Sequence, residues 1–340
     1  MNFVKKSTAN VADQERKIFK QIFAQNSALF ALALLFIIAI ILEGTTFLNV
    51  NNLMNILMNN SIVGIIALGM TLIIISGGID LAVGAQLAAT GLIAITVMNS
   101  TGSVILGILV ALLVGVLMGV ATGVLVAKFQ IPAFITTLGM MQIFRSVVQH
   151  FFNGGGILVD RESVGSFLTI SNTRVLDFGN FPGIPLPVIY WFVLAVIIHI
   201  VANRTAFGRH IYAVGSNERA SRLSGINVNY VKIGVYMLSG ALVVFAALVE
   251  ASRLGSMNSS ASGGAYELQA IAAVVIGGTA MSGGKGKISG TVFGMLTLGI
   301  INNMMNLMGL PSFLVAAIQG AIILLAVLLQ RSVAKKEKQY

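Results

Sequence analysis

Apolar segments of membrane-spanning length follow one another along almost the whole chain. About ten of them approach the roughly 20 apolar residues that a helix needs to cross the hydrocarbon core of a bilayer. Only 9% of the 340 residues are charged and the mean hydropathy is +0.92, whereas soluble domains carry about 25% charge. The sequence therefore predicts an all-α, polytopic membrane protein. The predicted spans cover residues 27–43, 61–76, 85–98, 103–127, 132–152, 186–203, 232–253, 268–279, 288–307 and 311–330.

The basic residues predict how these spans are oriented, because cytoplasmic loops carry an excess of Lys and Arg. With the N-terminus placed inside, most basic residues fall in the tail 1–26, the loop 204–231 and the tail 331–340. Those that fall outside, or near outer span ends, are Arg145, Arg161, Arg174 and Arg253. This asymmetry favours both termini in the cytoplasm, a transmembrane region at 27–330 and an external loop at 153–185.

The segment 49–60 differs from the apolar runs on either side of it. It is polar and rich in amides, with Leu53, Ile56 and Leu57 on one side. This pattern predicts a helix that lies in the membrane interface.

Two glycine-rich turns interrupt the apolar pattern. The turn 77–84 joins two short spans, and the turn 277–287 follows another short span. Paired short spans interrupted by glycine are typical of transporters, in which broken helices line a pathway. The pattern favours two inverted five-helix halves. The candidate pathway or broken-helix residues are Gly77, Gly78, Asp80, Gly84, Arg145, Gly277 and Gly278.

Two charged residues fall inside the predicted membrane region. Asp80 is either a pathway group or a cap whose carboxylate accepts backbone N–H groups where the next helix begins, and the surrounding glycines favour the cap. Arg145 either extends to the outer surface or hydrogen-bonds a polar solute. Glu250 and Arg253, three residues apart, are expected to form a local ion pair.

The basic loop 204–231 contains a short helix with stop signals at both ends. Asn217 is a favourable N-cap, Glu218 can pair with Arg222 one turn later, and Gly225 supplies the C-terminal stop. A simple linker does not need such caps, so we predict an exposed docking element on the cytoplasmic face. Its residues are Gly215, Ser216, Asn217, Glu218, Arg219, Ala220, Ser221, Arg222 and Gly225.

Other kinds of site are disfavoured. A phosphate-binding Walker loop at 283–287 lacks the required glycine, because Thr279 stands there, and Gly286 replaces the required Ser or Thr. The chain has no cysteine and only three scattered histidines, so we expect no metal site and no catalytic residues. The basic residues do not cluster on a polar domain, so we expect no nucleic-acid partner.

The glycine turns and the central loop resemble a known family. The segments 77–84, 206–209, 213–217, 224–226 and 266–279 are similar to the signatures of the ribose-type permease subunits of bacterial ATP-binding-cassette (ABC) sugar importers. The resemblance extends over about residues 47 to 331. This chain departs from the family at Ala82 and Gln269, where members often carry Ser and Asp.

The resemblance implies a ten-helix permease in the bacterial inner membrane that dimerises with a copy or a paralogue. It implies two cytoplasmic ABC ATPase subunits and an external sugar-binding protein as partners, with membrane lipid around the helices. ATP would bind to the partner subunits, and this chain would carry no cofactor. The docking element at 215–225 would be the helix that couples the permease to the ATPase.

Two alternatives compete with this reading. An ion-coupled secondary sugar transporter would need an ion site, for which Asp80 is the central acid available. An intramembrane enzyme would need a catalytic constellation at membrane depth, and the sequence offers none. An ABC permease performs no bond chemistry and needs only two arrangements of its helices.

Overall fold

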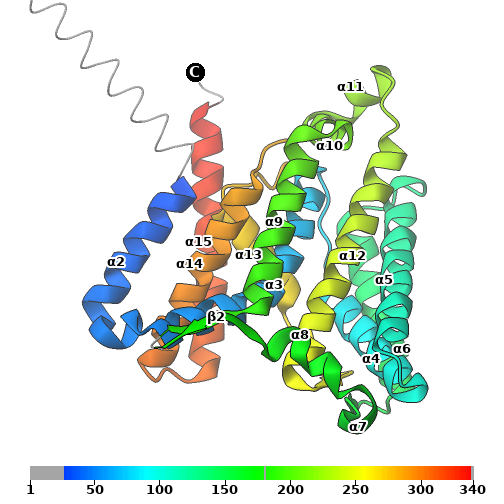
Figure 1. Cartoon of the computed structure of the whole chain (residues 1–340). Coiled ribbons are helices and arrows are strands. Elements are labelled where there is room, and N and C mark those ends of the chain that lie inside the picture. The colour runs from blue at the N-terminus through cyan, green and yellow to red at the C-terminus, as the bar shows by residue number, and fades with distance from the viewer. Residues whose placement is uncertain (1–26, 180, 338–340) are drawn as a thin grey trace, which may run out of the picture.

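The computed structural model describes residues 27–179 and 181–337, and it is built mostly of helices (Figure 1). The predicted N-terminal tail, 1–26, lies outside the described residues. The long helices are α2 (Ser27–Leu48), α3 (Val50–Ile75), α4 (Val83–Thr101), α5 (Val104–Ala127), α6 (Ala133–Phe151), α9 (Leu186–Arg204), α12 (Val228–Leu254), α14 (Ile288–Leu307) and α15 (Ser312–Glu337). The shorter helices are α7 (Arg161–Val164), α8 (Thr169–Asn172), α10 (Ala206–Ser216), α11 (Glu218–Leu223) and α13 (Tyr266–Ile276), with a 3-10 turn, η1 (Gly165–Leu168).

Each predicted span coincides with a helix. Within the described part of the chain, seven helices are long and apolar enough to cross a membrane by length and composition: α2, α3, α4, α5, α9, α12 and α14. The protein is therefore a mostly helical, polytopic membrane protein. Helix α13 has only 11 residues, which gives about 16 Å, or half of a typical hydrocarbon core. The total of ten crossings stays a prediction.

The predicted interfacial helix at 49–60 is not a separate element. It forms the first turns of α3, whose 26 residues run without a break from Val50 to Ile75. Asn49 begins this helix, because its side-chain oxygen accepts the backbone N–H of Asn51 at 2.9 Å. The amides lowered the hydropathy of the segment, although they do not interrupt helical hydrogen bonding. The second predicted span is therefore long rather than short.

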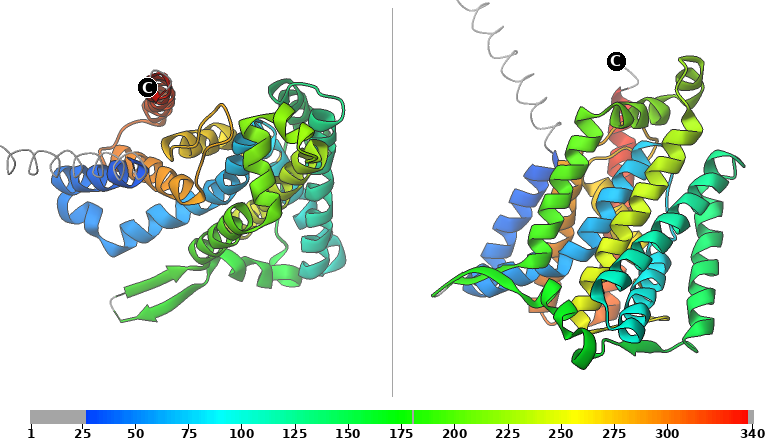
Figure 2. Two further views of the ribbon diagram at one scale, coloured as in Figure 1. Left: turned by 90° about the horizontal axis from the view of Figure 1, so that it is seen from above. Right: turned by 45° about the vertical axis from the view of Figure 1, so that its right-hand side comes forward.

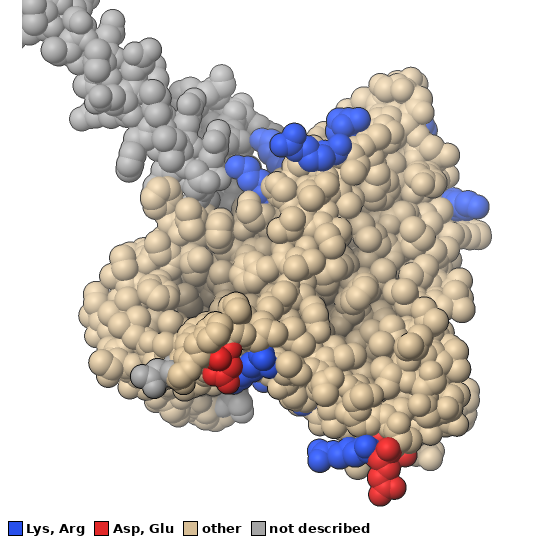
Figure 3. All heavy atoms as spheres, viewed as in Figure 1, with Lys and Arg blue, Asp and Glu red and all other residues tan. Residues whose placement is uncertain are grey.

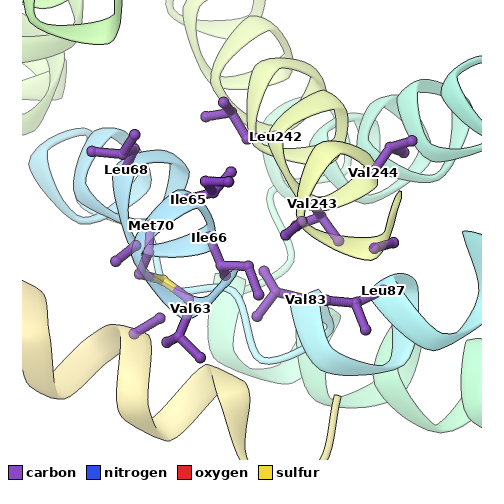
Figure 4. Close-up of a cluster of buried hydrophobic side chains, with 14 of the residues drawn as sticks. Val63, Ile65, Ile66, Leu68, Met70, Val83, Leu87, Leu242, Val243 and Val244 are labelled. Atoms are coloured by element: carbon purple, nitrogen blue, oxygen red, sulfur yellow. The ribbon is translucent and has the colours of Figure 1, made fainter. Parts of the chain in front are cut away.

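Helix α3 lies at the centre of the molecule. It is buried without a break from Asn60 to Ile75, and it contacts α9, α12, α13 and α14. Figure 4 shows side chains of α3, α4 and α12 meeting in this core, among them Ile66, Val83 and Val243. Lipid tails are as apolar as these side chains, so close packing rather than exclusion from water holds such helices together.

Helix α5 packs against α4 and α12 through a stripe of small residues. The buried positions at four-residue spacing are Gly107, Ala111, Gly115, Gly119 and Gly123. A Cβ at Gly119 would collide with the carbonyl oxygen of Tyr236 in α12. The two backbones approach closely because these positions carry almost no side chain.

The segment 153–185, which the structure describes except for residue 180, consists of short helices and strands and is too small for a domain. Its strand β1 (Gly156–Leu158) pairs antiparallel with β4 (Ser256–Asn258), and β2 (Arg174–Phe178) pairs with β3 (Phe181–Pro185). The β2–β3 hairpin extends away from the helices (Figure 2). The Ser252 hydroxyl donates to the carbonyl of Phe167 at 2.8 Å and so fastens this segment to α12.

The two ends of the molecule differ in charge. Helices α10 and α11 lie at one end together with the end of α15, and α7 lies at the opposite end (Figure 1). In the view of Figure 3, Lys and Arg occur without acidic neighbours near α10, whereas basic and acidic residues occur together near α7. We refer below to the α11 end and the α7 end.

Candidate coupling and transport site

The sequence prediction of a capped helix in the loop 204–231 is confirmed. Helix α11 begins after Asn217, whose Oδ1 accepts the backbone N–H of Ala220 at 2.9 Å. Glu218 Oε1 and Arg222 Nη2 form the expected pair at 3.1 Å. The chain turns away at Gly225, which has a left-handed φ of +82°.

A second partner of Glu218 could not be read from local spacing. Lys232, at the start of α12, places Nζ 2.7 Å from Glu218 Oε2. This hydrogen bond, together with the weaker one from Arg222, lowers the pKa of the Glu218 carboxyl below its ordinary value of 4.5. The contact fixes the short helix α11 to a long membrane helix.

Helix α11 presents an exposed surface at its end of the molecule. Arg219, Ala220 and Arg222 are exposed, and Leu223 is 83% exposed. Ser221 alone in this helix is buried. An exposed leucine framed by basic residues suits a protein–protein contact.

Helix α10 precedes α11 and was not predicted from the sequence. The Thr205 side chain accepts the backbone N–H of Gly208 at 3.1 Å and so caps the helix. Ile211 and Val214 are buried, and the Tyr212 hydroxyl donates to the carbonyl of Gly286 at 3.0 Å. Helix α10 thus joins the coupling loop to the glycine turn 277–287.

Three glycine-containing segments that are distant in sequence meet at the end of α10. The backbone N–H of Gly284 donates to the carbonyl of Ile75 at 2.8 Å. A Cβ at Gly215 would collide with the same carbonyl oxygen, and one at Gly283 would approach Gly77 and the carbonyl oxygen of Gly215. We call Ile75, Gly77, Gly215, Gly283 and Gly284 the glycine junction. It connects the end of α3, the end of α10 and the turn 277–287.

The remaining predicted glycines occupy other close contacts. Gly78 lies against the Tyr236 hydroxyl, and Gly277 lies against the backbone of Gly290 in α14. Gly278 has a left-handed φ of +85°. These contacts keep the turn next to the long helices and leave no room for larger residues at Gly78 and Gly277.

Asp80 acts as the predicted local acceptor. Its side chain is buried, and Oδ1 accepts the backbone N–H of Ala82 at 2.8 Å. The helix N-cap itself is Ala82, so Asp80 closes the turn ahead of α4 rather than capping the helix directly. The hydroxyl groups of Thr137 and Tyr236 both donate to the carbonyl of Ile79 at 3.3 Å and hold the same turn.

The start of α4 lies against the loop that leads into α13. A Cβ at Gly84 would collide with the carbonyl oxygen of Gly263 and approach the Glu267 carboxylate. Two irregular stretches of backbone thus support each other between the long helices. Such backbone is tolerated at membrane depth only where it is buried in protein or faces water.

Arg145 has protein partners that neither of its two predicted roles included, and those roles stay predictions. One of its guanidinium nitrogens donates to the carbonyl oxygens of Ser259 and Ser262, at 2.9 Å each. Both carbonyls belong to the loop before α13, so Arg145 in α6 holds that loop in place. Its partners are 114 and 117 residues away in sequence, which is why no local pattern indicated them.

The predicted ion pair between Glu250 and Arg253 is wrong. Arg253 donates to the Asn59 side-chain oxygen in α3 instead. Glu250 is buried and faces the side chains of Ser262 and Tyr266. The two side chains therefore form no direct ion pair, although the charge of Arg253 still acts on Glu250 over a longer distance.

A polar cavity of about 490 Å³ lies beside α11. Glu218, Lys232 and Tyr236 line it together with Gly77 and Gly78. The cavity therefore reaches from the docking element to the first glycine turn. Among the described residues, no group of three or more His, Cys, Asp or Glu side chains gathers as a metal ion would require.

Comparison with known proteins places the chain in a family. Residues 52–327 match the family described as "Branched-chain amino acid transport system / permease component". The chain belongs to this permease family. Because the match covers most of the chain, it includes the glycine turns, the coupling loop and the core.

Several curated relatives are similar over almost their whole length. The ribose import permease protein RbsC of Escherichia coli K12 is 41% identical over 302 residues, which is 87% of this chain and 91% of that protein. RbsC of Bacillus subtilis 168 is 41% identical over 319 residues, 94% of this chain and 96% of that protein. The L-arabinose transport system permease protein AraH of Escherichia coli K12 is 37% identical over 324 residues, 94% of each chain. No solved structure matches. The resemblance to ribose-type permeases is confirmed.

Proposed function

We propose that this chain is the transmembrane permease subunit of an ABC importer that carries a monosaccharide into the cytoplasm. The observation that carries this proposal is the similarity, over nearly full length, to permeases named for ribose and L-arabinose import. In this proposal an external binding protein delivers the sugar. ATP is hydrolysed by separate subunits, and this chain carries no cofactor.

The assembly would contain two permease chains and two cytoplasmic ATPase subunits in a bacterial inner membrane. The α11 end would face the cytoplasm, since the loop 204–231 at this end carries four arginines against one acid, Glu218, and cytoplasmic loops are rich in Lys and Arg. The end of α15 lies at the same end. An even number of crossings would put the N-terminus there as well.

We also infer two inverted halves of five helices, α2–α6 and α9 with α12–α15. The third helix of each half supports this division. Both α4 and α13 begin after an irregular stretch of backbone, and the two starts meet where Gly84 lies against Gly263. Facing broken helices of this kind are the usual product of inverted repeats in transporters.

Helix α11 and the glycine junction would transmit the motion of the ATPase. A contact can bias the two states of a permease only if it differs between them. Helix α11 is fixed to α12 through Glu218 and Lys232, and α10 is fixed to the turn 277–287 through Tyr212. A displacement of this loop therefore acts on both broken-helix regions at once.

Disruption of α11 tests this proposal. In Ala220→Pro the new residue lacks the N–H that donates to Asn217, and Arg219→Glu reverses an exposed charge. We expect both variants to insert normally, to lose ATP-driven uptake by about tenfold or more, and to release the ATPase subunits during purification, because a buried contact at a partner interface is worth about 1.4 kcal/mol or more. Uptake in proteoliposomes and co-purification measure these effects.

Glu162→Arg provides the matched control, because Glu162 is an exposed acid in the short helix α7 at the opposite end. It should change neither property. Retention of uptake and of bound ATPase in both α11 variants would contradict the role given to this helix.

A further inference from the structure

A second cavity, at the α7 end, is lined almost entirely by amides. It measures about 280 Å³, slightly below the usual range of about 300–1,000 Å³ for small-molecule sites. It lies between the start of α3, the start of α13 and the outer part of α14. Its polar lining residues are Asn59, Asn60, Gln269, Asn302, Asn303 and Asn306, which we call the amide pocket.

Part of the amide pocket is held in place by hydrogen bonds within the protein. The Asn303 amide exchanges two hydrogen bonds with Asn52, at 2.7 and 3.0 Å. The Asn302 oxygen accepts from the Gln319 amide at 2.7 Å. The Asn60 amide nitrogen donates to the carbonyl of Ile56 at 2.6 Å, which leaves its side-chain oxygen available. These contacts fix the orientation of the lining groups.

Two members of the pocket have no such partner. No other described residue hydrogen-bonds the side chains of Gln269, which is half-buried, or Asn306, which is exposed. Amides between membrane helices commonly join one helix to another, and the pair Asn52–Asn303 does so here. That explanation does not extend to Gln269 and Asn306, which line the pocket and whose side-chain amides are bonded to no other described residue.

The chemistry of the lining specifies a class of ligand. Each amide offers two donors and one acceptor oxygen, and no charged residue lines the pocket. A neutral solute with several hydroxyl groups can both donate to and accept from such amides, whereas an ion would find no opposite charge. We propose that the amide pocket is the first sugar-binding site on this permease, which receives a neutral monosaccharide on the external side. This inference rests on the proposed function and adds to it a substrate site.

An adjoining cavity extends the site between α13, α14 and α15. Its volume is about 150 Å³, it shares Gln269 and Asn302 with the amide pocket, and Ala265, Leu268 and Leu298 make it largely apolar. Carbohydrate rings have apolar C–H faces beside their hydroxyl edges. The amide pocket therefore offers groups that can bind the hydroxyls of a sugar, and the adjoining cavity offers an apolar surface for its C–H face.

Replacement of the unpartnered amides tests the site. Gln269→Leu and Asn306→Leu remove the hydrogen-bonding groups and preserve much of the volume, and they are made singly and together. Asn306→Gln retains an amide and should restore most of the uptake. The matched control is Asn55→Leu, an exposed amide on the same end of α3 that does not line the pocket.

The experiment uses the complete importer in proteoliposomes, with radiolabelled ribose and L-arabinose as probes. We expect each Leu variant to lower ATP-driven uptake about fivefold, and the double variant to lower it about 25-fold if the two sites act independently. ATP hydrolysis stimulated by the loaded binding protein should stay within about twofold of wild type, because α11 is untouched. The Asn55→Leu variant should match wild type in both measurements.

The outcomes separate this inference from the proposed function. Normal uptake by the double variant would overturn the amide pocket as a sugar site. So would a parallel loss of uptake, ATP hydrolysis and assembly size on gel filtration, because that result would show a structural role at a subunit interface. Failure of the wild-type importer to take up either sugar with ATP would overturn the proposed function, and the site with it.

Discussion

At the scale of single residues, Gly215 is the position where the coupling loop touches the membrane core most closely. Its backbone lies against the carbonyl of Ile75, and the same carbonyl accepts the N–H of Gly284. A residue with a side chain would separate these three segments. The junction therefore depends on the absence of a Cβ rather than on any functional group.

A methyl group at this position should weaken the junction. We expect Gly215→Ala to destabilise the protein by about 1–3 kcal/mol through overpacking, and to lower ATP-driven uptake. Gly139→Ala is the control, because Gly139 lies within α6 with no atom near its missing Cβ, and alanine there should stabilise by about 0.5–1 kcal/mol. Thermal unfolding of both variants in detergent measures the difference. Equal unfolding temperatures would show that the junction is not tightly packed.

Local features at this scale followed from the sequence, and distant contacts did not. The cap at Asn217 and the pair of Glu218 with Arg222 depend on spacing of three or four residues. The contacts of Arg145 with the loop before α13, and of Gly215 with Ile75, join residues more than a hundred positions apart. Periodicity carries no information on such pairs, because they arise only when helices pack.

At the scale of elements, α11 is stabilised mainly from outside itself. Six residues form too short a helix to be stable alone. The Asn217 cap and the contact of Glu218 with Lys232 in α12 add stability that the few backbone hydrogen bonds of α11 cannot provide. Loss of the ion pair with Lys232 should therefore loosen α11.

The docking of α11 should depend on pH in one window. The folded state lowers the pKa of Glu218 below 4.5. The ionised Glu218 carboxylate therefore stabilises the docking of α11 fully above pH 4.5, and this stabilisation is lost as the pH falls through the pKa of the folded state. The side chain is 44% exposed, so we expect a contribution of at most about 1 kcal/mol. The native chain has no cysteine, so a single spin label at Leu223→Cys reports the mobility of α11.

The mobility of that label should be constant from pH 7 to about pH 4.5 and should increase at lower pH. Adding Glu218→Gln should give the higher mobility at every pH. A mobility change centred near pH 6, or identical curves with and without Glu218→Gln, would contradict the assignment of this contact.

Two elements were misread in the sequence for a common reason. The amides of 50–60 lowered the hydropathy of a segment that nevertheless continues as α3, and the mixed residues of 206–216 concealed α10. Hydropathy measures how readily a side chain enters lipid, whereas the hydrogen bonds of a helix form between backbone groups. A polar segment can therefore continue an apolar helix. The apolar spans and the capped helix α11 were predictable, whereas α10 and the polar start of α3 were not.

At the scale of the whole molecule, the candidate sites lie at opposite ends of the same helices. The amide pocket uses the start of α3 and the glycine junction uses its end. Likewise α13 begins beside the pocket and ends at the turn 277–287. Rigid helices that connect two sites allow a displacement at one end to alter the other, provided that the molecule has two discrete arrangements.

The central claim is that work done by separate ATPase subunits enters this chain through α11. The most direct measurement is sugar uptake into proteoliposomes containing the purified permease, alone or with its ATPase subunits and binding protein, with and without ATP. We expect uptake above the background of empty vesicles only when all partners and ATP are present. Accumulation of ribose or L-arabinose by the permease alone, driven by a proton or sodium gradient, would contradict the account.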